Sequence, residues 1–224
     1  MRKIFRFSFR LFLFMCTVQV FAQEADTVKA TKSISAGIEV SGPVLYALDN
    51  SKYNLEGYFS YRINNKYYIV LEPGYSRYNY SQYNYDYNCQ GWFFRIGTDI
   101  GMLEPVASKV NHFAGIGLRY GLSVFEQEAP FISVDSFWGK ASTAIPANFV
   151  HAHFLEVQGS VKTELFRNFL IGWAIKLRTH LYSSDSNVKK AIYIPGMGNT
   201  GASFTPAFSY YIIYRIPLRN SSGE

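Results

Sequence analysis

The sequence predicts an all-β fold, an eight-stranded antiparallel up-and-down transmembrane β-barrel, and three observations support this prediction. Segments of about ten residues alternate between apolar and polar side chains, which is the period of a strand with two different faces. The connections between these segments alternate in length. An export signal precedes the first segment, and from residue 33 onward no window has helical periodicity or a long apolar run.

The chain of 224 residues begins with the features of a secretory signal peptide. Four basic residues lie within the first ten, and an apolar run of twelve residues ends at the small residue Ala22. Cleavage after Ala22 is therefore predicted. An uncleaved anchor is the alternative, but a spanning helix needs about 20 apolar residues. Cys16 lacks the small preceding residue of a lipidated cysteine.

Removal of the signal changes the charge balance. The full chain has 22 Lys and Arg against 16 Asp and Glu, a net charge of +6, which invites a nucleic-acid partner. Four of the positive charges lie in the signal, so 18 remain against 16 and the mature chain is near +2. No nucleic-acid partner is therefore expected. One cysteine, Cys89, remains, and it has no second cysteine for an internal disulfide.

The predicted organisation has four parts. Residues 1–22 form the signal peptide, 23–32 a short periplasmic segment, 33–218 the barrel domain and 219–224 a C-terminal tail. The alternating segments of the barrel domain, in chain order, are 34–41, 53–63, 67–74, 91–102, 113–125, 155–164, 169–181 and 208–218.

The third of these segments contains two irregularities. Val70 interrupts its polar face. Pro73 has no backbone N–H to donate to a neighbouring strand, so a bulge or a local break is expected there.

Alternation alone does not decide which face is inside. The apolar face could point inward, as in a soluble lipocalin-type barrel, or outward into lipid. Connections 64–66, 104–111 and 166–168 are short, whereas 42–51, 81–88, 127–149 and 183–203 are mostly longer. Short periplasmic turns and long external loops are typical of outer-membrane barrels.

The polar face is charged on almost every segment. Six acids and seven bases share it, and this near balance is suited to a narrow lumen filled by ion pairs, because unpaired buried ions are costly. The predicted lumen charge network comprises Glu39, Glu56, Arg62, Glu72, Arg95, Asp99, Arg119, Glu156, Lys162, Glu164, Lys176, Arg178 and Arg215.

Large aromatic residues lie on the apolar face, several of them near segment ends. Membrane barrels place such residues in girdles at the two lipid–water interfaces, so outer-membrane lipids are the expected partners. The predicted interface aromatics are Tyr53, Tyr61, Tyr67, Tyr75, Trp92 and Trp173.

The signal, the strand count, the alternating connections and the aromatic last segment at 210–216 together give a family resemblance. The sequence resembles the small eight-stranded outer-membrane barrels of the OmpA and OmpX type over about residues 33–218. The resemblance implies the outer membrane of a gram-negative bacterium and assembly by the barrel-insertion machinery. Residues 219–224 depart from the pattern, because such barrels end on an aromatic residue.

His151 and His153 are the best candidates for chemistry. Both have the parity of the lipid-facing side, as in barrel enzymes that modify lipids. A catalytic partner is not evident, because Glu156 has the opposite parity and no serine lies two residues from either histidine. His-x-His could also bind a metal, yet no carboxylate or cysteine completes a site. A headgroup contact is the simpler account, so no catalytic residue, metal or cofactor is expected.

The run 78–88 alternates tyrosine with asparagine and other polar residues on either side of Ser81 and Gln82, as expected if the hairpin continues above the membrane with a turn there. Such a surface could serve recognition, or the tyrosines could simply favour strands. The expected loop 128–148 carries Phe131, Phe137 and Trp138, which could cap the barrel or contact a partner. Cys89 has lumen parity and is expected to be a buried spectator.

These features predict a structural or surface-interaction protein and not a diffusion pore, because eight strands enclose only enough space for side chains. Two alternatives remain: a membrane-embedded lipid-modifying enzyme using His151 and His153, and a soluble periplasmic ligand-binding barrel. The ligand or partner is not identified by any motif.

Overall fold

The computed structural model describes residues 32–103, 112–136, 139–184 and 190–218. The predicted signal peptide, the tail, the connection 104–111 and the residues Phe137 and Trp138 lie outside this part of the chain.

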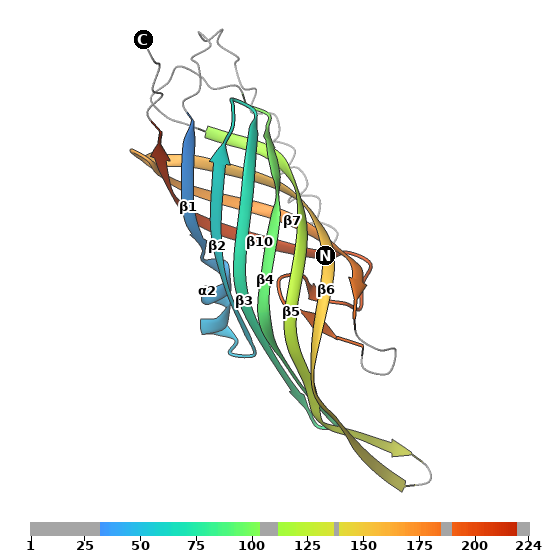
Figure 1. The fold of residues 1–224 in the computed structure, drawn as a ribbon. Helices are drawn as coiled ribbons and strands as arrows, with labels where there is room; N and C mark the ends of the chain where they lie inside the picture. Colours follow the sequence, from blue (N-terminus) through green and yellow to red (C-terminus); the bar gives the residue numbers. More distant parts are fainter. Residues whose placement is uncertain (1–31, 104–111, 137–138, 185–189, 219–224) are drawn as a thin grey trace, which may run out of the picture.

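Eight strands close into an antiparallel barrel, which confirms the predicted fold class (Figure 1). Each strand pairs with its neighbours in chain order, and the last strand pairs with the first, so the connection is up-and-down. The barrel strands are β1 (Ser33–Glu39), β2 (Lys52–Arg62), β3 (Tyr67–Gln82), β4 (Tyr85–Gly101), β5 (His112–Ser136), β6 (Gly139–Phe166), β7 (Phe169–Ser183) and β10 (Thr205–Pro217).

Three further elements lie in the connections at one end of the barrel. Helix α2 (Ser41–Leu48) follows β1, and strands β8 (Tyr193–Ile194) and β9 (Gly198–Asn199) form a small hairpin before β10. The helix was not predicted, because eight residues with a proline in the first turn are too few to establish a helical period. No helix in the described residues is both long and apolar enough to cross a membrane.

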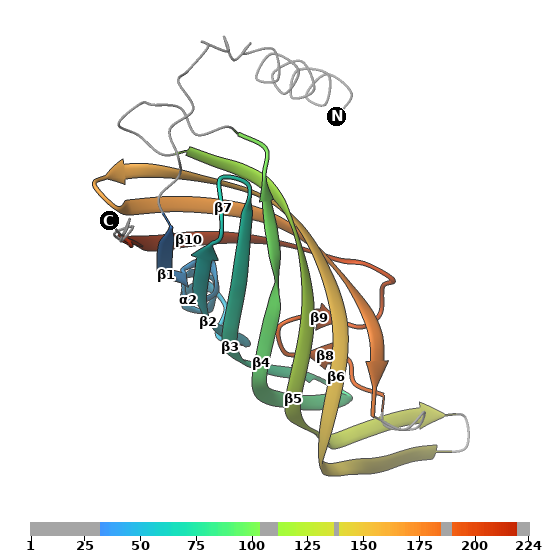
Figure 2. The ribbon, with the colours of Figure 1, turned by 45° about the horizontal axis from the view of Figure 1, so that its top comes forward.

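Two of the expected external loops are instead continuations of strands. β3 and β4 extend to a turn at Tyr83 and Asn84, and β5 and β6 extend to residues 136 and 139 (Figure 2). The expected loop at 127–149 was therefore wrong. At 78–88 the expected hairpin is present, but its turn lies two residues later than the expected one at Ser81 and Gln82. The physical reason is that cross-strand pairing and tyrosine-rich alternation continue beyond the region where the outward face is apolar.

Pro73 produces a local break and not a bulge. Pairing of β3 with β4 is continuous, with Pro73 opposite Phe94. On the other side, pairing of β2 with β3 is interrupted between the pairs Glu56–Gly74 and Phe59–Leu71, and the register is the same before and after. The interruption follows from the missing N–H of proline.

The two faces of the wall differ sharply. Apolar side chains point outward and are exposed, for example Ile96, Leu118 and Ile175 at 53–55%. Inward side chains are buried, and along β3 they change from Val70 through Glu72 to Tyr78. The lumen thus has a charged middle between two apolar clusters.

Candidate functional site

Arg95 on β4 is the centre of the charged lumen. Its guanidinium is fully buried and forms ion pairs with Glu56, with Glu72 (Nε to Oε2, 3.0 Å) and with Glu156 (Nη1 to Oε2, 3.1 Å). Lys176 adds contacts from Nζ to Glu56 at 3.0 Å and to Glu72 at 3.7 Å. Three buried carboxylates therefore depend on two cations, Arg95 from a neighbouring part of the wall and Lys176 from across the lumen.

Asp99 forms a second centre on the same strand. Its carboxylate contacts Arg119 Nη2 at 2.6 Å and Lys162 Nζ at 3.1 Å, and it accepts a hydrogen bond from Gln158. Lys162 also donates to the Tyr58 hydroxyl at 2.6 Å. Arg119 Nε lies 4.0 Å from Glu72, which joins the two centres.

Strand register brings several of these charges together. Glu72 lies opposite Arg95, and Glu156 lies opposite Arg119 on one side and Arg178 on the other. Arg178 Nε donates to Glu156 at 2.7 Å. Opposite charges at cross-strand positions stabilise a sheet, and closure of the ring adds the contacts across the lumen.

The remaining four residues of the predicted network lie apart from it. Glu164 forms an ion pair with Arg215 at 2.7 Å, near the end of the barrel that lies away from α2 and the β8–β9 hairpin. Arg62 Nε donates to the carbonyl oxygen of Asn64, and its guanidinium lies over the Tyr68 ring. Glu39 accepts hydrogen bonds from the backbone amides that begin α2.

The tyrosine run 78–88 contributes to a buried cluster at the end of the barrel that carries β8 and β9. Tyr78 and Tyr87 are buried, and the Tyr78 ring lies 4.7 Å from that of Tyr193 on β8. The Tyr87 hydroxyl donates to Gln127 at 3.0 Å. The sequence analysis missed this role. The signal was available, because Tyr78 and Tyr87 stand at positions of the same parity as the lumen-facing residues of their strands.

The β8–β9 turn lies directly over the charged centre. Arg95 Nη1 donates to the Gly196 carbonyl at 3.4 Å, and Arg178 Nη1 donates to the Met197 carbonyl at 3.3 Å. Gly196 has φ +78°, and a Cβ there would lie 2.5 Å from the Phe93 ring, so glycine permits this close approach. The turn therefore plugs one end of the lumen.

Aromatic residues follow one border of the apolar outer face. Tyr53, Tyr75 and Trp92 form a chain of ring contacts, with centroids 6.5 Å and 5.1 Å apart. The next outward positions on β3 and β4, Arg77 and Gln90, are polar and directly paired. On β3 and β4 the apolar face ends at this row.

The other three predicted interface aromatics lie elsewhere. Tyr61 and Tyr67 flank the turn at 63–66, at the opposite end of the barrel. Trp173 stacks on Phe208 of β10, with centroids 6.1 Å apart.

His151 and His153 point outward beside aromatic rings. Tyr120 Oη lies 2.6 Å from His153 Nδ1, and the two imidazole rings are 5.9 Å apart. The part of the chain that the structure describes contains no group of three His, Cys, Asp or Glu residues able to hold a metal ion.

Cys89 lies beyond the row of Arg77 and Gln90, inside the tyrosine cluster. Its side chain is buried and its Sγ donates to the Tyr193 carbonyl at 3.4 Å. Burial raises the pKa of this thiol to about 12, because a thiolate is poorly solvated there. Since the thiolate is the reactive form, Cys89 is expected to stay unreactive at neutral pH.

The fold and the site define a class of protein: a closed eight-stranded barrel with an ion-filled interior and an apolar outer face. The chain belongs to the family described as Domain of unknown function (DUF6048), whose model matches residues 1–221. No curated protein shows significant similarity to the sequence.

Solved structures resemble the chain at low identity. Ail, the attachment invasion locus protein of Yersinia pestis, is 12% identical, with a TM-score of 0.37 and coverage of 84% of this chain and 100% of Ail. CarO of Acinetobacter baumannii is 11% identical, with a TM-score of 0.37 and coverage of 82% of this chain and 97% of CarO.

Proposed function

We propose that the protein is exported and inserted as a β-barrel into the outer membrane of a gram-negative bacterium, where it has a structural or surface-interaction role. The observation that carries the proposal is the distribution of polarity across the barrel wall. Leucine, isoleucine and aromatic side chains cover the outside, whereas Arg95, Asp99, Arg119 and Glu156 are fully buried inside.

This distribution is suited to lipid and not to water. Apolar area exposed to water costs about 25 cal/mol per Å², and a continuous apolar wall is rare on soluble monomers. Along most of its wall the barrel also pairs its backbone groups internally, as hydrocarbon surroundings require. A soluble ligand-binding barrel would instead place its apolar face around the ligand.

The lumen supports a structural or interaction role more than transport. Charged side chains cross the middle of the lumen and the β8–β9 turn lies over them, so no open channel is left and the surfaces beyond the apolar band are the ones that large partners can reach. There, the hairpins β3–β4 and β5–β6 present residues such as Tyr83, which is 89% exposed. Tyrosine provides rigid amphipathic contact area for recognition.

Membrane fractionation tests the location. The mature protein is expected in the outer-membrane fraction, soluble only with detergent, and to migrate differently on a gel before and after boiling, because an unboiled barrel stays folded. Release of the protein by osmotic shock would instead identify a soluble periplasmic barrel.

Cysteine labelling in intact cells tests which end faces outward. In a chain carrying Cys16→Ser, Tyr83→Cys should react at neutral pH with a membrane-impermeant maleimide, whereas native Cys89 should not. Lys66→Cys, in the turn at the opposite end, should react only after the cells are permeabilised. If intact cells label Lys66→Cys and not Tyr83→Cys, the barrel has the opposite orientation, and the proposal that its hairpins are exposed outside the cell is refuted.

We further propose that the role is not enzymatic. Among the described residues, neither imidazole ring of the His151 and His153 pair has a carboxylate or serine partner, and their neighbours are Tyr120 and Tyr182. The double variant His151→Ala/His153→Ala should therefore leave the acylation pattern of outer-membrane lipids unchanged, as measured by mass spectrometry. An altered pattern would favour the lipid-modifying alternative.

A further inference from the structure

The barrel wall has a lateral gap, because β1 is short. β1 has seven residues, whereas a tilted strand needs about 9–11 to cross the hydrocarbon layer. Residues 205–209 of β10 pair only with β7, and residues 52–56 of β2 pair only with β3. No strand therefore joins these two segments beyond the end of β1.

Helix α2 covers this gap and is fixed to both of its edges. The Ser41 hydroxyl bridges the Phe208 carbonyl and the Tyr210 amide, each at 3.4 Å, in place of a strand partner. The Glu39 carboxylate accepts from the amides of Ser41 at 2.9 Å and Gly42 at 2.8 Å. A Cβ on Gly42 would lie 2.3 Å from the Asn54 carbonyl oxygen, so only glycine permits this approach to β2.

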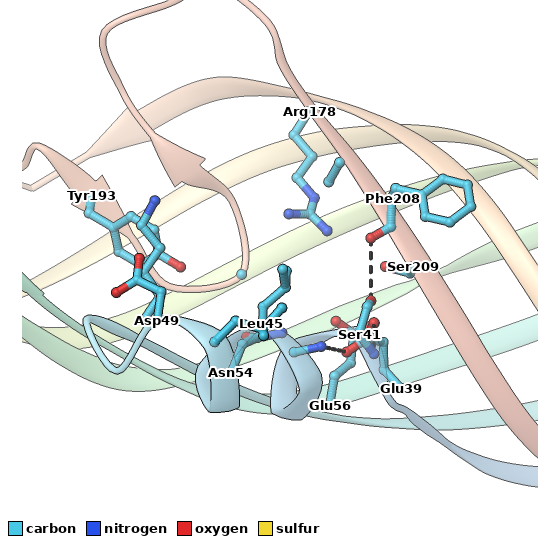
Figure 3. A pocket seen from close by; sticks show the side chains of 15 residues that line it. Glu39, Ser41, Leu45, Asp49, Asn54, Glu56, Arg178, Tyr193, Phe208 and Ser209 are labelled. Atoms are coloured by element: carbon cyan, nitrogen blue, oxygen red, sulfur yellow. Dashed lines mark hydrogen bonds between the residues drawn. The ribbon is translucent and has the colours of Figure 1, made fainter.

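Two cavities meet at the helix. The inner cavity, of about 360 Å³, is lined by polar residues that include Lys52, Asn54 and Arg178 (Figure 3). The outer groove, of about 660 Å³, is lined by apolar residues that include Val44 and Trp173. Both cavities are lined by Ser41, Leu45 and Phe208. The polar cavity inside and the apolar groove outside thus share three lining residues at the gap, which makes the gap the candidate opening between them.

We propose that this opening binds a single-chain anionic amphiphile of the membrane, with its acyl chain in the outer groove and its headgroup in the inner cavity. The inference rests on the proposed membrane location, because the groove lies on the outer face of the barrel. Both volumes are within the roughly 300–1,000 Å³ of ligand pockets in proteins.

The inner cavity is lined by three carboxylates and two cations, and the hydrogen-bonding capacity that remains is on the cations. Its carboxylates are already engaged: Glu39 with the helix amides, Glu56 with Arg95 and Lys176, and Asp49 with the Ser51 amide.

Two cations keep donors available. Arg178 uses Nε and Nη1 for Glu156 and Met197, which leaves Nη2 without a hydrogen bond among the described residues. Figure 3 shows its guanidinium directed toward the cavity. The Lys52 ammonium lies over the Tyr78 ring, 5.1 Å from its centroid, and in the described part of the chain it makes no ion pair. A carboxylate headgroup would accept a hydrogen bond from Nη2 of Arg178 and would give Lys52 an anionic partner.

Tryptophan quenching by dibromostearate, a fatty acid with a brominated chain, tests the proposal in nanodiscs of saturated phosphatidylcholine. One variant keeps only Trp173, in the groove, and the other keeps only Trp92, on the outer face of β4, with the remaining tryptophans changed to phenylalanine. We expect half-quenching of Trp173 at a roughly tenfold lower concentration, the ratio produced by about 1.4 kcal/mol of preference. The uncharged methyl ester should quench both residues equally.

Variants then separate the headgroup site from general membrane affinity. Lys52→Gln should shift the Trp173 half-quenching concentration toward that of Trp92, whereas Lys66→Gln, which changes an exposed lysine in a distant turn, should have no effect. Equal quenching of Trp173 and Trp92 by the acid would show that the groove holds only bulk lipid, which overturns the inference but not the membrane location. Absence of quenching at both tryptophans would overturn the proposed binding site and the membrane location together.

Discussion

Arg95→Met is expected to destabilise the folded barrel by about 3–5 kcal/mol, the cost of removing one partner from a buried ion cluster. The substitution keeps the unbranched stem of the side chain but removes the guanidinium, which leaves Glu56, Glu72 and Glu156 with fewer cations. Lys176 and Arg178 compensate only in part, because each already contacts these same carboxylates. The measurement is urea-induced unfolding in phosphatidylcholine vesicles, followed by tryptophan fluorescence.

Arg215→Met is the matched control. Arg215 also forms a short ion pair, with Glu164, but this is a single pair with some remaining exposure, 14% and 8% of the two side chains, and Glu164 also accepts from the Asn168 amide. The loss of Arg215 should cost less than the loss of Arg95, because it leaves one carboxylate without its cation and not three. Equal effects of the two substitutions would contradict the view that the Arg95 cluster is shielded from water. Arg95→Lys should lie between them, since it restores one charge without the fork of the guanidinium.

Leu118→Arg is expected to destabilise the barrel in vesicles by about 2–4 kcal/mol, the cost of arginine on the lipid face near the middle of the membrane. Leu118 is 54% exposed on β5 and has the outward-facing neighbours Thr98 and Val157 on the adjoining strands. In a soluble barrel the same change would place a charge in water at almost no cost. The sign and size of this effect therefore test the membrane location independently of fractionation.

Phe131→Arg is the control for Leu118→Arg. Phe131 is also exposed and lies on the same strand, opposite Asp86 and beyond the row of Arg77 and Gln90. Outside the hydrocarbon layer the arginine is solvated, so the effect should stay within about 1 kcal/mol. Unfolding midpoints that fall equally for the two variants would contradict the proposed position of the membrane border.

Most of the wall could be predicted from the sequence, because a strand has a side-chain period of two. The alternation of Phe169, Ile171 and Trp173 with Ala174 and Lys176 is enough to assign faces on β7, and the structure places these residues as expected on the two sides. The external extent of the strands was harder to predict. The tyrosine-rich continuation of β3 and β4 reads equally well as an exposed loop or as a hairpin whose inward face is buried by β8 and β9.

The candidate opening beside α2 could not be predicted. It depends on β1 ending at Glu39 while β10 and β2 continue, and strand ends are set by pairing and not by local pattern. Helix α2 is itself too short to give a periodic signal. Gly42 and Ser41 acquire their roles only because Asn54 and Phe208, distant in sequence, lie against them.

The sequence by itself determined the strand count, the face of each strand and the near balance of charge, since these depend on composition and on the local period of the backbone. Only the tertiary structure decided which charges meet. Glu72 and Arg95 pair through strand register, but Lys176 reaches Glu56 only across the closed lumen. The parity of Glu39 assigned it to the charge network. In the structure its carboxylate instead accepts hydrogen bonds from the backbone amides at the start of α2 and so anchors the helix.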